Sequence, residues 1–76
     1  MRIYIEAIEI LEETEETATV PDFIRIDITD LTEQERKEVL EAIREHFAGK
    51  KYRIQIHYCY HDEGKPCEVK IIEVKE

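Results

Sequence analysis

The fold of this chain is decided by its last third, Tyr52-Arg-Ile-Gln-Ile-His-Tyr-Cys-Tyr-His-Asp-Glu-Gly-Lys-Pro-Cys-Glu-Val-Lys-Ile-Ile-Glu-Val74. Apolar and polar residues alternate on both sides of residues 62–65, and Gly64 in that turn suits a positive φ. The segment therefore predicts a β-hairpin. Because it also holds both cysteines, three of the four tyrosines and two of the three histidines, we expect any chemistry of this protein to lie here.

A helix is predicted immediately before this hairpin, over residues 33–48. Thr32 and Glu35 have the spacing of a capping box, in which each side chain accepts a hydrogen bond from a free amide at the helix start. Gly49 supplies a left-handed residue at the other end. Four apolar residues fall on one stripe of the helix, which predicts packing against a sheet: Val39, Leu40, Ile43 and Phe47.

Two further strands are predicted before the helix, over residues 2–11 and 18–29. In the first strand the apolar positions change parity, so either a bulge lies near Ala7 or both faces of the strand are covered. Pro21 has no amide hydrogen, which places the second strand at a sheet edge or bends it there. Residues 12–17 are too charged to pair well and are predicted to form a connecting turn.

The element order is therefore ββαββ, which predicts an α+β fold with one helix packed on a four-stranded sheet. The 76 residues suffice for a single domain, 1–76. This order is similar to the β-grasp arrangement of ubiquitin and of the immunoglobulin-binding domain of protein G, in which the two terminal strands lie side by side in the middle. The chain lacks the Gly-Gly tail by which ubiquitin-like proteins are conjugated, so that activity is not implied.

Two registers are open for the final hairpin, and they place its thiols differently. A three-residue loop pairs Cys59 with Cys67. A four-residue loop pairs Tyr58 with Val69 and leaves the two cysteines on opposite faces. The hydrophobic pattern favours the second register, because it stacks apolar residues on apolar residues. We therefore expect Cys67 to be buried and Cys59 to be exposed or to lie in an interface. The parity change at Ile72 predicts a bulge in the last strand.

Four residues of the hairpin are candidate metal ligands: His57, Cys59, His61 and Cys67. The favoured register separates the thiols, and the spaced cysteine pairs of zinc modules are absent, so the sequence predicts no bound metal or cofactor. A Cys59–Cys67 disulfide requires the other register. A nucleophilic Cys59 would require a neighbouring base and a pocket, and no such constellation is evident. We therefore do not expect an enzyme.

Composition and charge narrow the class of protein. The net charge is -8, with -7 over residues 1–30, -2 over 33–48 and +1 over 49–76, and such a field disfavours nucleic acid as a partner. No apolar run is long enough to cross a membrane, and no signal peptide is evident, which predicts a cytoplasmic protein. The absence of Ser and Asn and the abundance of Glu, Lys and Ile are typical of hyperthermophile proteins and also of engineered chains.

These observations predict a small acidic domain that works by contact with a protein partner or by self-association. The alternative is a metal-binding or redox-active hairpin, and a third hypothesis is an acidic mimic of nucleic acid. A homodimer would form through an exposed sheet edge or through the outer face that carries His57 and Cys59. The expected contact residues are Tyr60, His57, Cys59, Glu12, Glu13, Glu15 and Glu16.

Overall fold

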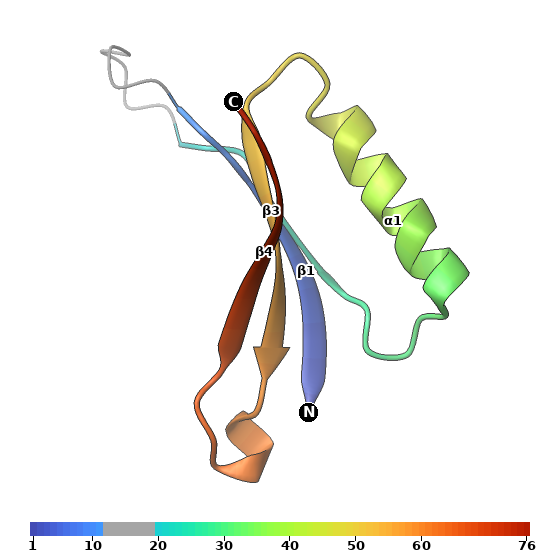
Figure 1. Cartoon of the computed structure of the whole chain (residues 1–76), viewed down its shortest axis with the longest axis vertical. Coiled ribbons are helices and arrows are strands. Elements are labelled where there is room, and N and C mark those ends of the chain that lie inside the picture. The colour runs from blue at the N-terminus through green and yellow to red at the C-terminus, as the bar shows by residue number, and fades with distance from the viewer. Residues whose placement is uncertain (12–19) are drawn as a thin grey trace.

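A computed structural model describes residues 1–11 and 20–76 of the chain. The elements follow the predicted order and form an α+β fold, in which α1 covers one face of the sheet (Figure 1). They are β1 (Arg2–Glu9), β2 (Phe23–Asp27), α1 (Glu33–His46), β3 (Tyr52–Cys59), the short 3₁₀ helix η1 (His61–Glu63) and β4 (Glu68–Lys75). Among the described residues, no helix is long and apolar enough to span a membrane.

The sheet has the strand order β2-β1-β3-β4, and every neighbouring pair is antiparallel. This order differs from the β-grasp arrangement, because the last strand lies at an edge and β1 pairs with β3 instead. The antiparallel β1–β3 pair starts at Arg2 opposite Cys59 and ends at Glu9 opposite Tyr52. The two predicted hairpins are confirmed, and the helix lies between them in the chain.

The helix begins at the predicted capping box. The Thr32 hydroxyl accepts a hydrogen bond from the Glu35 amide at 3.1 Å, and the Glu35 carboxylate accepts one from the Thr32 amide at 3.0 Å. Gly49, just beyond the helix, has a φ of 81°, which an L side chain rarely adopts. The apolar stripe packs on the sheet as predicted, so the core consists of Ile5, Ala7, Ile28, Ile43, Phe47, Tyr52 and Ile54.

The first two strands differ in detail from the prediction. β1 pairs with both neighbours in an unbroken register from Tyr4 to Ile8, so the bulge near Ala7 is absent. Residues on both faces of the strand are buried around Glu6 and Ala7, which agrees with the other alternative. Ile8 consequently lies on the sheet face opposite the core. β2 is an edge strand, as Pro21 indicated, but it is shorter than the predicted 18–29 and starts at Phe23. The predicted acidic turn at 12–17 lies outside the described residues.

The register of the β3–β4 hairpin is where the prediction was wrong. Tyr58 pairs with Glu68, and His57 pairs with Val69, which is the register of the shorter loop. Gly64 ends η1 with a φ of 69°, and the Lys65 amide donates to the Tyr60 carbonyl at 3.2 Å. The 3₁₀ turn therefore closes the loop one residue earlier than the hydrophobic pattern indicated.

The predicted bulge in β4 is confirmed, and it explains how the strand keeps its apolar contacts. Gln55 pairs with Ile71, whereas Ile54 pairs with Glu73, so Ile72 has no partner opposite it on β3. Beyond the bulge, Arg53 pairs with Val74, which is the register that the apolar pattern favoured. Each predicted register is thus correct for one end of the hairpin.

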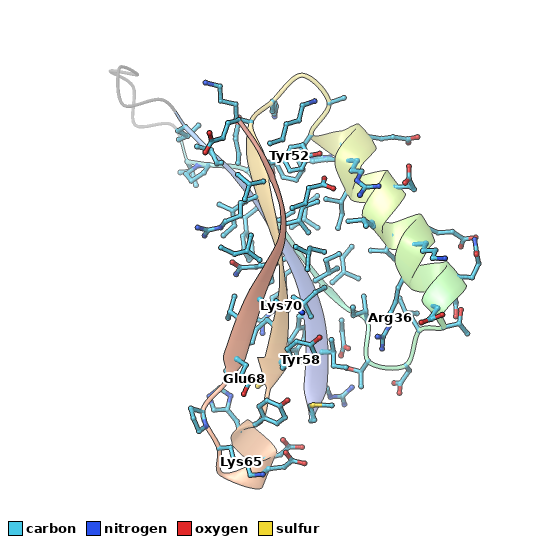
Figure 2. All side chains as sticks on the ribbon, in the orientation of Figure 1. Arg36, Tyr52, Tyr58, Lys65, Glu68 and Lys70 are labelled. Carbon is cyan, nitrogen blue, oxygen red and sulfur yellow. The ribbon has the colours of Figure 1, made fainter. Side chains whose placement is uncertain are left out.

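A charged network joins the far end of β4 to the helix. The Arg44 guanidinium donates to both carboxylate oxygens of Glu73 at 2.7–3.2 Å, and the Tyr52 hydroxyl donates to the same carboxylate at 2.8 Å. These hydrogen bonds from Arg44 and then Tyr52 lower the pKa of Glu73 below its ordinary value of 4.5. In Figure 2 Tyr52 lies between β3 and the end of α1.

Candidate metal centre

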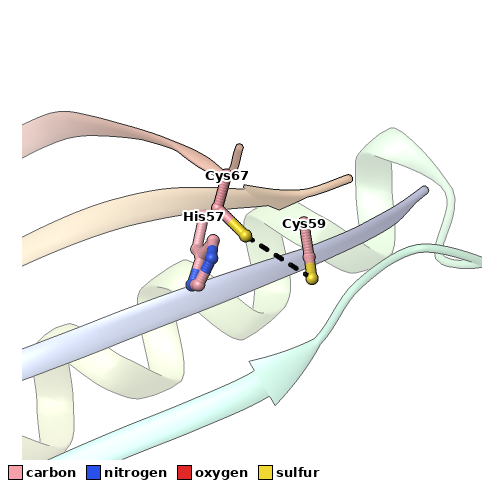
Figure 3. A group of neighbouring side chains, drawn as sticks. All are labelled: His57, Cys59 and Cys67. Carbon is pink, nitrogen blue, oxygen red and sulfur yellow. Dashed lines mark hydrogen bonds between the residues drawn. The ribbon is translucent and has the colours of Figure 1, made fainter. Parts of the chain in front are cut away.

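The corrected register brings the sulfur and imidazole side chains of the hairpin together at its turn end. Cys59 is the last residue of β3 and Cys67 directly precedes β4. Continuing the Tyr58–Glu68 register by one pair places them opposite each other. Both are half-buried, and they point to the face of the sheet that α1 does not cover, where His57 lies beside them (Figure 3). The expectation that the thiols face opposite sides is therefore wrong.

The spacing of the two sulfurs suits a shared metal ion. Cys59 Sγ and Cys67 Sγ are 3.7 Å apart. Two thiolates bound to one tetrahedral zinc ion at about 2.3 Å would lie about 3.8 Å from each other. A disulfide requires the same two atoms to approach to about 2.05 Å, and both cysteines are free. The observed separation therefore matches one edge of a tetrahedral site.

His61 lies against both thiols because η1 turns the chain back after Tyr60. His61 Nδ1 is 2.9 Å from Cys59 Sγ and 3.6 Å from Cys67 Sγ, and Nε2 is 3.5 Å from Cys67 Sγ. A nitrogen and a sulfur ligand of one tetrahedral zinc ion lie about 3.6 Å apart, so the contact with Cys67 fits such a site, whereas the contact with Cys59 is shorter. The group of ligand atoms that all lie close to one another contains His57, Cys59 and Cys67 but not His61. His61 is exposed, so its ring has room to adjust around an ion.

His57 approaches the thiols from the strand side, and its ring is held by a buried carboxylate. Its ligand atom and the two sulfurs all lie within 4.8 Å of one another. Nδ1 is 3.4 Å from the Glu6 carboxylate on β1, while Nε2 is buried and has no hydrogen-bond partner among the described residues. A carboxylate on one imidazole nitrogen leaves the other as a lone-pair ligand, which is the usual arrangement behind a metal-bound histidine.

Glu6 is the site residue that sequence reasoning missed. It is buried, with 7% of its surface exposed, and its carboxylate also accepts from Gln55 at 2.8 Å and lies 3.4 Å from Arg25 Nε. A glutamate alternating with the apolar residues of β1 reads as an ordinary outward side chain. Only the pairing of β1 with β3, which sets Glu6 beside Gln55, reveals its role.

The surroundings of Cys67 favour the neutral thiol. Loss of solvent raises the pKa of this thiol above its ordinary value of 9.0, and the Cys59 sulfur raises it further. A hydrogen bond at the Tyr60 backbone acts in the opposite direction. A bound cation would reverse this balance, because it stabilises the thiolate directly.

The remaining predicted contact residues are Tyr60, which does not belong to this cluster of thiols and imidazoles, and the four glutamates among residues 12–16. Tyr60 is half-buried, and loss of solvent raises its pKa, with Glu68 and Glu63 adding to the effect. The acidic run of predicted contact residues lies outside the described residues: Glu12, Glu13, Glu15 and Glu16.

In the comparison with known proteins, no family model, curated protein or solved structure gives a significant match to the chain. The case for a function therefore rests on the geometry of the cluster.

Proposed function

We propose that this protein binds a thiophilic divalent cation, zinc being the best fit, at the turn end of the β3–β4 hairpin. The observation that carries the proposal is the 3.7 Å separation of Cys59 Sγ and Cys67 Sγ. The two thiolates form the shared edge of the site, and His57 and His61 supply the nitrogen ligands. Thiolate and imidazole are the ligands that zinc prefers, whereas magnesium and calcium prefer oxygen.

Within this site the residues have distinct roles. Cys59 and Cys67 neutralise the cation and hold the two strands together beyond the last ladder pair. Glu6 orients His57 by accepting a hydrogen bond at Nδ1, which leaves Nε2 for the ion. Because His61 belongs to the exposed turn, its ligation closes the site and orders η1. The bound ion would act as a staple in a domain whose core is small.

Cobalt substitution combined with native mass spectrometry tests this proposal. Zinc should add one ion per chain, and chelator should remove it. The cobalt-loaded protein should show sulfur-to-metal charge transfer near the intensity of two thiolates, with tetrahedral visible bands. Cys59→Ala and Cys67→Ala should each abolish stoichiometric binding, whereas Glu63→Gln, an exposed acid in the same turn, should leave it unchanged. Failure of the reduced parent to retain zinc would overturn the proposal.

A second candidate function is a reversible thiol switch, which the same sulfur separation favours. In thiol–disulfide exchange, one thiolate attacks a small-molecule disulfide and releases one thiol, and the second thiolate then attacks the mixed disulfide and releases the other. Cys59 and Cys67 are thereby oxidised to one disulfide, and the small-molecule disulfide is reduced to two thiols that carry the two protons and two electrons. The oxidised chain would be two hydrogens lighter and unable to bind zinc. The same mass spectra, recorded with and without reductant, separate the two functions: a two-hydrogen deficit that forms under mild oxidant and disappears in reductant would favour the switch, whereas a disulfide that persists in strong reductant would contradict it.

A further inference from the structure

The two edge strands of the sheet present different surfaces to solvent. β2 has five residues, and its outer end is tied to β1 by the Arg2–Asp27 ion pair at 3.3 Å. β4 has eight residues, contains no proline, and exposes about half of each of four large apolar side chains. These side chains are Val69 (54%), Ile71 (53%), Ile72 (43%) and Val74 (48%). A long apolar edge of this kind is a template for pairing with another strand.

The charged residues of β4 alternate in sign along one face. Glu68, Lys70, Glu73 and Lys75 stand opposite Tyr58, Ile56, Ile54 and Tyr52, so all four lie on the face that α1 covers. Figure 2 labels Glu68 and Lys70 along the strand. In the opposite chain direction, this row becomes Lys, Glu, Lys, Glu. Antiparallel alignment of the strand with itself therefore sets opposite charges against each other.

The bulge makes this self-pairing possible. Residues that stand opposite each other in an antiparallel pair have their side chains on the same face of the sheet. In a regular strand that pairs with its own copy about a twofold axis, an even-numbered residue must therefore stand opposite an even-numbered one, and an odd-numbered residue opposite an odd-numbered one. In β4 the residues on the face that α1 leaves open are Val69 and Ile71 before the bulge but Val74 after it. The bulge changes the parity, so Glu68 can face Lys75 of the second copy while Val69 faces Val74. Lys70 then faces Glu73, and the two residues of each pair lie on a common face.

The neighbouring registers either place opposite residues on different faces of the sheet or set like charges against each other. A shift of one residue sets Val69, which lies on the face that α1 leaves open, against Glu73 or Lys75 on the other face. A shift of two residues restores the faces but sets Lys70 against Lys75 or Glu68 against Glu73. Like charges directly opposite each other destabilise a strand pair, whereas opposite charges stabilise it. Among these registers, only the pairing of Glu68 with Lys75 satisfies both packing and charge.

We infer that this edge takes a second copy of the chain, and that the protein forms a homodimer through antiparallel β4–β4 pairing in the Glu68–Lys75 register. The two four-stranded sheets then join edge to edge into one continuous sheet. Val69 and Val74 of each copy meet on the open face and withdraw part of their apolar surface from water. The inference is independent of the metal, because none of the pairs across the dimer involves a candidate ligand.

Charge reversal with a compensating exchange tests the register. Glu68→Lys sets two lysines against each other at both ends of the paired strands, and Lys75→Glu sets two glutamates against each other at the same two places. Either single change turns two attractive cross-strand charge pairs into repulsive ones, so it should weaken dimerisation about tenfold. The double variant E68K/K75E restores opposite charges and should return the dissociation constant to within about threefold of the parent.

Sedimentation equilibrium in reductant and chelator measures these constants without interference from disulfides or metal. Glu38→Lys and Lys65→Glu serve as matched controls, because they make the same charge changes at exposed positions outside β4. Both controls should dimerise like the parent. A parent that stays monomeric at about millimolar concentration overturns the inference, as does a double variant no tighter than the weaker single variant. Loss of dimer in the controls would show a net-charge effect and overturn it equally.

Discussion

At one end of the β3–β4 hairpin, Tyr52 and Ile54 are buried under α1 and Glu73 is clamped by Arg44. At the other end, the residues that meet across the strands are two thiols with two imidazoles beside them. The first end is fixed by packing and by hydrogen bonds within the chain. In the proposal above, the second end is completed by a bound metal ion.

The bulge at Ile72 lies between these two ends and separates their registers. On the helix side it lets Ile54 stay in the core while Glu73 reaches Arg44. On the turn side it keeps Cys59 opposite Cys67. A single extra residue thus allows one hairpin to serve both the core and the proposed metal site, and the two ends should respond differently to mutation and to metal.

The largest difference is expected from the core end. Ile54 is fully buried, so Ile54→Ala should lower the free energy of unfolding by about 3 kcal/mol through lost burial and a residual cavity. Urea denaturation should give this loss equally with zinc and with chelator. A cost that appears only when zinc is present would mean that the two ends are not independent.

Zinc should act in the opposite way, at the turn end alone. A ligand that binds only the folded state, at a free concentration about 100 times its dissociation constant, stabilises it by about 2.7 kcal/mol. With zinc, the free energy of unfolding of the parent should rise by this amount, whereas that of Cys59→Ala should not change. In chelator, Cys59→Ala should be less stable than the parent by less than about 1 kcal/mol, because only a half-buried thiol is removed. Thermal melts of both proteins, with buffered free zinc, measure the difference. An equal gain in Cys59→Ala would show that zinc binds elsewhere.

The orienting role of Glu6 predicts a smaller effect on affinity. Glu6→Gln removes the charge that holds Nδ1 of His57, so zinc affinity should fall by about 10- to 100-fold. Competition with a chromophoric chelator measures this loss. The control is Asp27→Asn, which removes an acid from the same face of the sheet and should change affinity little. Unaltered affinity in Glu6→Gln would contradict the orienting role of Glu6.

The smallest effect is expected at the Glu73 network. Glu73→Gln should cost about 1 kcal/mol at neutral pH, because a partly exposed charge-assisted contact to Arg44 is lost. The folded-state pKa of Glu73 is depressed, so its contribution is complete above the ordinary value of 4.5 and is lost as the pH falls through the depressed value. Parent and variant should therefore converge in stability in acid. A difference that persists in strong acid, below the depressed pKa, would assign the effect to packing.

Much of the fold could be predicted because it rests on local patterns. The capping box, the apolar stripe and Gly49 located α1, since each acts within a few residues of its own position. Pro21 indicated the edge position of β2. The strand order could not be predicted in the same way, because the pairing of β1 with β3 rather than β4 depends on how the crossover helix returns the chain to the sheet.

The candidate site depends on which register the β3–β4 hairpin adopts near its turn, and the sequence does not show this. The four proposed ligands were visible in the sequence as candidates, but the apolar pattern of the whole hairpin favoured the register that separates the thiols. That pattern was read over the whole of β4 as though one register held throughout, whereas the bulge gives the two ends of the strand different registers. The 3₁₀ turn at His61 set one register, and the core around Ile54 set the other.

By itself the sequence determined the element types and their order, the inward faces of the helix and strands, and the residues from which a site would be built. Those features follow from short-range periodicity and capping, in which each residue is judged by its neighbours along the chain. The tertiary structure alone decided the order β2-β1-β3-β4, the meeting of Cys59 with Cys67, and the carboxylate of Glu6 behind His57. These are contacts between strands, where a one-residue change of register reverses which side chains share a face.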